Sequence, residues 1–175
     1  MARALDSERK NGMLTSMDVV NESRGRFKQI VTPSLKYCDF VIINEIEACM
    51  IAGLPVRNNG KLQKDSLKDI CHKLLENGIK EEIIIHMPEG ACAMDLKENF
   101  LFVPLLNLPE NYIKGTVGAG DAYFAGILLS IYKGYDIEQA LKIGAGAAAC
   151  CLSEINSIDG MKGIKEIENL IDQYG

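Results

Sequence analysis

The chain has 175 residues, a length that suits one hydrophobic core, and we expect a single domain over residues 1–175. Hydrophobic residues make up 47% of it and charged residues 25%, as in ordinary globular proteins. The net charge of −5 argues against a nucleic-acid partner, because a phosphate backbone needs a basic face. No apolar stretch is long enough to cross a bilayer, and residues 1–10 lack a signal-peptide core. We therefore expect a cytoplasmic protein without a membrane partner.

The cysteines do not indicate a metal site. No two of them form a CxxC pair, and neither histidine lies at ligand spacing beside them. We therefore expect no zinc. We interpret most of the cysteines as small buried hydrophobic residues in a reducing compartment. They are Cys38, Cys49, Cys71, Cys92, Cys150 and Cys151.

Strands and helices alternate along the chain. Apolar spacing predicts strands at 13–20, 40–43 and 83–85, and two short strands within 91–103 that are joined at 97–99. It predicts helices at 23–37, 44–53, 60–77, 118–132, 137–152 and 161–174. Asn44 is the expected cap of the helix at 44–53. Pro33 breaks or restarts the first of these helices. Strands separated by helices imply parallel pairing. The predicted fold is α/β, a Rossmann-like three-layer α/β/α arrangement with a mostly parallel central sheet, which binds ligands at the carboxyl ends of its strands.

The beginning of the chain is unusual for such a fold. The strand at 13–20 reads like an interior strand, yet it lies almost at the N-terminus. Residues 1–11 look like the end of a helix and its loop. We therefore expect the chain to be the later portion of a larger protein.

Residues 115–124, GTVGAGDAYF, carry the chemistry. The small residues at 118–120 let backbone N–H groups approach an anion closely, at a helix start where the dipole is positive. Asp121 lies in the first turn, where its carboxylate stays ionised and can take a proton from an attacking hydroxyl. Together these are the minimal equipment for phosphoryl transfer. The residues alone leave another reading open, in which the glycines only pack helix on strand and the Asp is a cap. No Walker A sequence is present, and no GxGxxG follows a strand.

The segment GTVGAGDAYFAG resembles the C-terminal signature DTxGAGDxFxxG of the ribokinase/PfkB carbohydrate kinases. The matching residues are Thr116, Gly118, Ala119, Gly120, Asp121, Phe124 and Gly126. Upstream, residues 44–48 read NEIEA and resemble the NxxE motif of the same family, again just after a buried strand. The resemblance covers nearly all of this chain but roughly the C-terminal half of a family member. The N-terminal sugar-binding segment and the small β-sheet lid of the family are not visible.

The resemblance implies roles for these positions. Asp121 would be the catalytic base, and the N–H groups of Gly118, Ala119, Gly120 and Asp121 the anion hole for the transferred phosphoryl group. Asn44 and Glu47 would hold Mg²⁺ and its waters near the phosphates of ATP, and they share one helix face at i and i+3. The alternative interpretation of Glu47 is a solvated helix residue without a role in metal binding. The remaining nucleotide-binding positions would be Gly90, Thr116 and Gly146, together with Asn44.

Several positions depart from the family pattern. Gly115 replaces the first signature Asp, which puts potassium activation in doubt. Residues 85–90, IHMPEG, stand where the family often has TLGxxG, and only Gly90 matches. His86 either supplies a donor to the nucleotide there or is a satisfied strand-end histidine.

Two further segments carry weaker resemblances. Gly146 lies in GAGAAAC, where the family often has Asn beside adenine, and close helix packing is an equally good account of it. Residues 17–21, MDVVN, loosely resemble the strand-end DxN element of sugar kinases. Arg24 and Arg26 follow it and either approach the substrate or are exposed helix residues.

The function that the sequence favours is an ATP-dependent, Mg²⁺-dependent phosphotransferase that acts on a hydroxyl of a sugar or nucleoside. The alternatives are a non-catalytic nucleotide-binding remnant of such a kinase and an unrelated Rossmann-like binding module. We expect the 175-residue form to bind ATP weakly and to phosphorylate no sugar efficiently. We also expect self-association, as a homodimer, through an exposed sheet edge.

Overall fold

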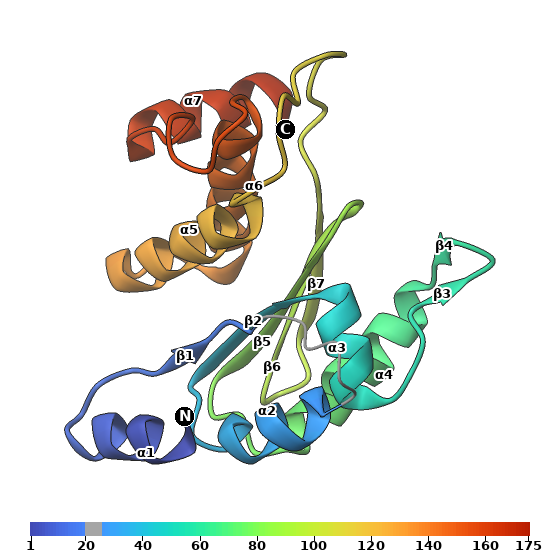
Figure 1. Cartoon of the computed structure of the whole chain (residues 1–175), viewed down its shortest axis with the longest axis vertical. Helices are drawn as coiled ribbons and strands as arrows, with labels where there is room; N and C mark the ends of the chain where they lie inside the picture. The colour runs from blue at the N-terminus through green and yellow to red at the C-terminus, as the bar shows by residue number, and fades with distance from the viewer. Residues whose placement is uncertain (20–25) are drawn as a thin grey trace. The chain divides into compact units, whose positions relative to one another are not determined.

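The structure is a computed structural model that describes residues 1–19 and 26–175 (Figure 1). Asn21 and Arg24, and the start of the helix expected from residue 23, lie outside the described residues. The chain divides into two compact units. Unit 1 comprises residues 1–87 and 92–102, and unit 2 comprises residues 88–91 and 103–175. That the chain is a single domain stays a prediction.

A five-stranded sheet has the strand order β1-β2-β5-β6-β7. Its strands are β1 (Ser16–Met17), β2 (Phe40–Asn44), β5 (Glu82–Met87), β6 (Gly90–Asp95) and β7 (Phe100–Pro104). β1 and β5 both pair with β2 in parallel, with Asn44 in register with His86. The expected mostly parallel sheet is wrong: the sheet is mixed. Residues 88–89 alone join β5 to β6, and residues 96–99 join β6 to β7. Connections this short can only join antiparallel neighbours.

The N-terminal segment follows its prediction only in part. Residues 2–10 form a helix, α1 (Ala2–Lys10), followed by a loop as expected, and an ion pair of 3.2 Å between Arg9 and Asp39 connects α1 to the rest of unit 1. Of the described part of the strand expected at 13–20, which ends at residue 19, only β1 is paired in the sheet, and residue 20 lies outside the described residues. The Asp39 carboxylate accepts hydrogen bonds from the Thr15 backbone N–H (2.7 Å) and from its hydroxyl (2.9 Å). A side chain thus takes the place of a ladder partner just before β1.

Unit 1 has its core between one face of the sheet and its helices. The helices are α2 (Phe27–Leu35), α3 (Glu45–Ala52) and α4 (Lys64–Leu75), and a small hairpin of β3 (Arg57–Asn58) and β4 (Lys61–Leu62) precedes α4. Both α3 and α4 lie on the same face of the sheet (Figure 1). Alternate strand residues, such as Ile43 and Ile85, point to this face and pack in one buried cluster with Ile51 and Leu74. Pro33 lies inside α2 and does not break it.

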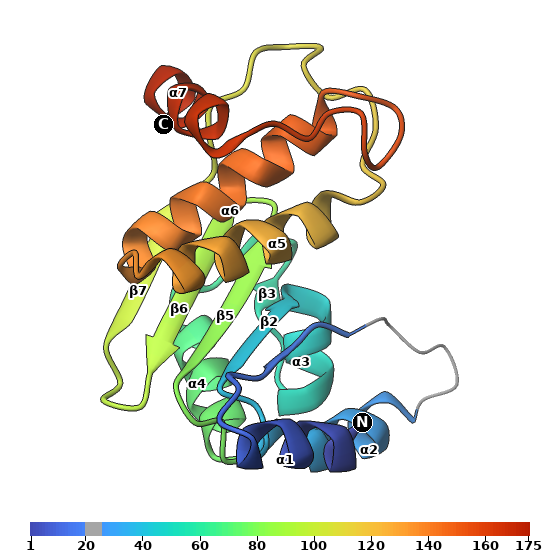
Figure 2. The ribbon, with the colours of Figure 1, turned by 90° about the vertical axis from the view of Figure 1, so that its left-hand side faces the viewer.

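Unit 2 is a helical layer of α5 (Ala119–Lys133), α6 (Ile137–Leu152) and α7 (Ile164–Tyr174). Side by side in Figure 2, α5 and α6 approach closely through glycines. A Cβ atom at Gly126 would lie 3.0 Å from the Cα atom of Gly144, so a larger residue there would push the helices apart. α7 packs on α6 through Ile167. Among the described residues, no helix has the length and apolar character that a membrane span requires.

Candidate active site

The α3 start, at the carboxyl end of β2, is built by Asn44 and Glu47. The Asn44 side-chain oxygen accepts a hydrogen bond from the Glu47 N–H, and the Glu47 carboxylate accepts one from the Asn44 N–H, both at 3.0 Å. This reciprocal pair is a capping box, so Asn44 caps the helix as predicted. Glu47 is only 4% exposed, and the alternative of a solvated helix residue is therefore wrong.

The Glu47 carboxylate is buried, and described residues donate hydrogen bonds to only one of its two oxygens. Burial raises its pKa, the hydrogen bonds from Asn44 oppose that rise, and the charge of Asp18 adds to it. Its Oε2 atom accepts from Asn44, whereas no described residue donates to Oε1. A carboxylate oxygen to which no described residue donates fits a role in holding a metal-bound water.

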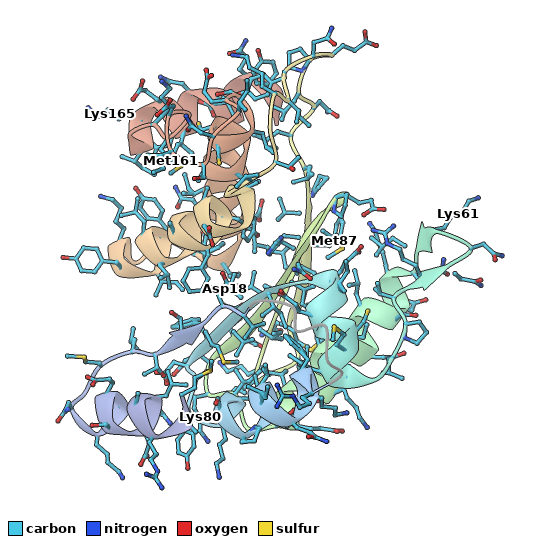
Figure 3. All side chains as sticks on the ribbon, in the orientation of Figure 1. Asp18, Lys61, Lys80, Met87, Met161 and Lys165 are labelled. Atoms are coloured by element: carbon cyan, nitrogen blue, oxygen red, sulfur yellow. The ribbon has the colours of Figure 1, made fainter. Side chains whose placement is uncertain are left out.

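Asp18 is a residue that the sequence analysis did not connect with the metal. It follows β1 directly and is labelled in Figure 3. Because β1 and β2 are parallel neighbours, Asp18 and the Asn44–Glu47 pair both lie at the carboxyl ends of these strands. An acidic residue just after the neighbouring strand was the available signal. Within residues 1–19 and 26–175, no cluster of three His, Cys, Asp or Glu side chains is arranged to hold a metal ion.

His86 lies on β5 directly beside Asn44 in the register of the sheet. Burial lowers its pKa to about 4. The imidazole is therefore neutral near pH 7 and can both donate and accept a hydrogen bond. A nucleotide contact through this ring stays a prediction.

In unit 2, the Ala119 N–H at the start of α5 donates to the carbonyl oxygen of Thr116 at 3.4 Å. Gly118 is the N-cap and has a φ of 84°, in the left-handed region that glycine adopts without strain. The backbone N–H groups of Gly120 and Asp121 donate to no described residue. Asp121 lies exposed in the first turn, and no other described side chain pairs with its carboxylate. The geometry thus presents two free donors and one free carboxylate at one helix start.

Loop 153–160 lies against the segment before α5. A Cβ atom at Gly118 would lie 2.5 Å from the Cβ of Ser157. One at Gly115 would lie 2.7 Å from the carbonyl oxygen of Ile155 and 2.8 Å from that of Glu154. An Asp at position 115, as in the family signature, therefore has no room in this arrangement. Thr116, the second signature residue, is exposed.

The other two predicted nucleotide-binding glycines have different surroundings. Gly90 is buried at the start of β6. Gly146 faces α7, where a Cβ atom would lie 2.7 Å from Ile167 and 3.0 Å from Ile171. Helix packing therefore accounts for the glycine at 146, and its contact with a nucleotide stays a prediction.

The structure thus gathers the predicted residues into two sets. Asn44 and Glu47 lie together in unit 1, and residues 118–121 lie together in unit 2. Two surface cavities of about 400 and 320 Å³ lie along α6 and α7 of unit 2 and include none of these residues.

Comparison with known sequences identifies relatives. A protein-family model described as pfkB family carbohydrate kinase matches residues 1–162. The 5-dehydro-2-deoxygluconokinase of Geobacillus kaustophilus is 27% identical over 176 residues, which cover 98% of this chain and 50% of that protein. The ribokinase of Arabidopsis thaliana is 24% identical over 153 residues, covering 87% of this chain and 38% of that protein. The chain thus spans about half the length of the first of these relatives, and less of the second.

Comparison with solved structures shows the fold. Arabidopsis thaliana ribokinase complexed with ribose and ATP matches with a TM-score of 0.81 at 20% identity, over 97% of this chain and 51% of that one. An E. coli protein assigned provisionally as ribokinase II, in complex with ATP and Mg²⁺, matches with a TM-score of 0.75 at 20% identity, over 98% of this chain and 53% of that one.

Proposed function

The chain belongs to the pfkB family of carbohydrate kinases, and from that premise we propose that it carries the nucleotide-binding and catalytic residues of an ATP-dependent phosphotransferase. The acceptor is a hydroxyl group of a sugar or a nucleoside. The observation that carries the proposal is the start of α5, where the N–H groups of Gly120 and Asp121 donate to no described residue and no described side chain pairs with the Asp121 carboxylate.

The proposed chemistry at α5 is an in-line transfer. The Asp121 carboxylate takes the proton of the acceptor hydroxyl, and the oxygen so freed attacks the γ-phosphorus of ATP. The bond from that phosphorus to the bridging oxygen breaks, and ADP leaves. The backbone N–H groups of residues 118–121 donate to the phosphoryl oxygens as negative charge shifts among them. Gly118 allows this approach because it has no side chain.

Asn44 and Glu47 are the residues proposed to hold Mg²⁺, through its waters. The ion neutralises charge on the phosphates when it is bound. Two observations support this assignment: no described residue donates to Oε1 of Glu47, and the charge of Asp18 raises the pKa of Glu47. The capping box holds the Glu47 carboxylate in place before any ion arrives.

The relatives support the choice of substrates. The Arabidopsis ribokinase structure contains ribose and ATP, and the E. coli structure contains ATP and Mg²⁺. ATP, Mg²⁺ and a sugar-like alcohol are the corresponding proposals for this chain. Because the chain spans about half the length of its relatives, the identity of the acceptor is left to experiment.

The test measures ATP binding by calorimetry, and then ADP release with a panel of sugars and nucleosides against a blank without acceptor. It applies to this chain and to any longer form of the protein. Acceptor-dependent ADP release establishes the transferase. ATP binding with no acceptor-dependent release in any form favours the alternative, a nucleotide-binding protein without transfer. A chain that binds no ATP contradicts both.

A further inference from the structure

A buried thiol joins the segment before α5 to the loop after α6. Cys151 is 1% exposed, near the C-terminal end of α6. Its Sγ atom lies 3.4 Å from the carbonyl oxygen of Val117 and 3.6 Å from that of Ser157, both within hydrogen-bonding distance for sulfur. The thiol has a single proton to donate, and the shorter of the two distances is the one to Val117. Cys151 therefore contacts both segments at the point where α5 begins.

Two glycine contacts join the same two segments independently of the thiol. Gly115 lies against the backbone of residues 154–155, and Gly118 lies against Ser157. Little apolar burial accompanies these contacts, since the Val117 side chain is 69% exposed and that of Ile155 is 77% exposed. Polar contacts must therefore contribute much of the free energy that keeps the segment before α5 against the loop after α6.

The thiol keeps its proton at neutral pH. Burial raises the pKa of Cys151, and the nearby charge of Asp121 raises it further. A protonated thiol is a donor, which is what two carbonyl acceptors require. The reactive thiolate form, by contrast, is disfavoured at this position.

The carbonyl of Val117 belongs to the same peptide group as the N–H of Gly118. A trans peptide is planar, so its carbonyl and its N–H point in opposite directions. A donor that fixes the Val117 oxygen on the side of Cys151 therefore aims the Gly118 N–H away from that side. Gly118 has no side chain to restrict rotation of this peptide, so the restriction must come from a neighbour.

We propose that Cys151 is a positioning residue for the anion-binding loop: its thiol holds the Val117–Gly118 peptide in the orientation that presents the Gly118 N–H to a phosphoryl group. This inference rests on the proposed function of residues 118–121. Cys151 does not touch the reacting atoms and acts through the peptide alone.

The chain offers a matched control in the adjacent residue. Cys150 is also buried, but its side chain packs in the apolar cluster between α6 and α7, with Ile143 and Ile167. Cys150→Ala removes the same atoms from the same helix without removing a donor to Val117. Cys151→Ala removes the donor, and Cys151→Ser restores a donor on a shorter side chain.

Two readouts decide the matter. Amide hydrogen exchange over residues 116–121 reports the loop itself, and calorimetric titration with ATP and Mg²⁺ reports its use. We expect faster exchange in Cys151→Ala than in Cys150→Ala, and an affinity for ATP lower by about 2- to 10-fold, the range of one net hydrogen bond. Cys151→Ser should recover part of both effects.

The outcomes separate this inference from the proposed function. A parent chain that binds no ATP overturns the proposed function, whereas the exchange comparison still reports whether Cys151 holds the loop. If Cys151→Ala and Cys150→Ala exchange alike, the thiol has no positioning role. Unequal exchange with equal ATP affinity overturns the inference too, because the peptide would then be held without consequence for the anion.

Discussion

Asn44 and Glu47 bind each other through two reciprocal hydrogen bonds of 3.0 Å across the first turn of α3. The same two residues are the ones proposed to hold Mg²⁺. A capping box alone would explain why Asn and Glu occur three positions apart after a strand. The motif therefore caps α3 whether or not it also holds Mg²⁺. A substitution must separate the capping role from the metal-binding role.

Glu47→Gln separates them. Glutamine can also complete a capping box, and a neutral side chain avoids the cost of burying charge that raises the pKa of Glu47. We expect the free energy of unfolding at pH 7 to equal or exceed that of the parent, within about 1 kcal/mol. The Mg²⁺ concentration needed for half-maximal ATP binding should rise. Chemical denaturation and titration of ATP at graded Mg²⁺ measure the two quantities.

Glu45→Gln is the matched control, because Glu45 lies on the same helix turn and pairs with Arg57 at 2.8 Å. It removes an equal charge without touching the capping box. A Mg²⁺ requirement that rises equally in both variants would reduce the effect to general electrostatics. An unchanged requirement in Glu47→Gln would leave the motif a helix cap alone.

Asp121→Asn tests the proposed base. The carboxylate is exposed and pairs with no described residue, so the substitution should change the unfolding free energy by less than about 1 kcal/mol. ATP affinity should also stay close to that of the parent. In any form of the protein that phosphorylates an acceptor, single-turnover transfer should fall by ~10²–10⁴-fold. A variant that transfers within a few-fold of the parent would remove Asp121 from the mechanism.

Gly118→Ala tests the anion hole, with Gly134→Ala as its control. Both glycines have a left-handed backbone, with φ of 84° and 73°, at opposite ends of α5. An added Cβ costs each position about 1–2 kcal/mol of backbone strain. Only at Gly118 does it also meet a neighbour, Ser157, whereas position 134 has nothing within 4 Å.

We expect both glycine variants to lose stability in thermal denaturation, and Gly118→Ala to lose more. ATP affinity should fall only in Gly118→Ala. Equal affinities in the two folded variants would contradict an anion hole at this loop. Valine at position 118 is a poorer probe, because its larger side chain makes the same contact worse and threatens the fold of the loop.

Local signals in the sequence predicted the helices that carry the site. The start of the helix expected at 118–132 is confirmed: Gly118 is the N-cap of α5, and a left-handed glycine acts through its own backbone. Asn44 was likewise predicted as a cap from its place after a β-branched run. These features depend on neighbours within one helical turn.

Features that depend on distant residues were not predictable in the same way. The Thr15 N–H and hydroxyl donate to the carboxylate of Asp39, which lies far along the chain. The contact that excludes a side chain at Gly115 comes from residues 154–155. Burial of Glu47 also depends on the packing of unit 1 as a whole. Such contacts are set by the fold, and composition and spacing do not encode them separately.

Glu82 and His86, on the same strand, are expected to affect stability in opposite directions as the pH changes. Burial lowers the pKa of His86 to about 4. Between pH 6.5 and 4 the unfolded chain therefore binds a proton that the folded chain refuses, so stability is lost as the pH falls. Burial, with the charges of Asp95 and Glu81, raises the pKa of Glu82 to about 7. Between pH 4.5 and 7 the folded chain holds a proton that the unfolded chain releases, so stability is lost as the pH rises.

Between its unfolded and its folded pKa, each group changes the free energy of unfolding by on the order of 3 kcal/mol, at ~1.4 kcal/mol per pKa unit. The two changes oppose each other between pH 4.5 and 6.5. His86→Gln leaves only the effect of Glu82, so its unfolding free energy relative to the parent should fall as the pH rises from 4 to 6.5. Glu82→Gln leaves only the effect of His86, so its stability relative to the parent should increase as the pH rises from 4.5 to 7. Urea denaturation at half-unit pH steps measures both differences, in which the titration of all other groups cancels.

Profiles that run parallel to the parent in both variants would show that neither group titrates differently in the folded chain. Opposite slopes would place a neutral imidazole beside Asn44 at neutral pH, because the two residues are in register on adjacent strands.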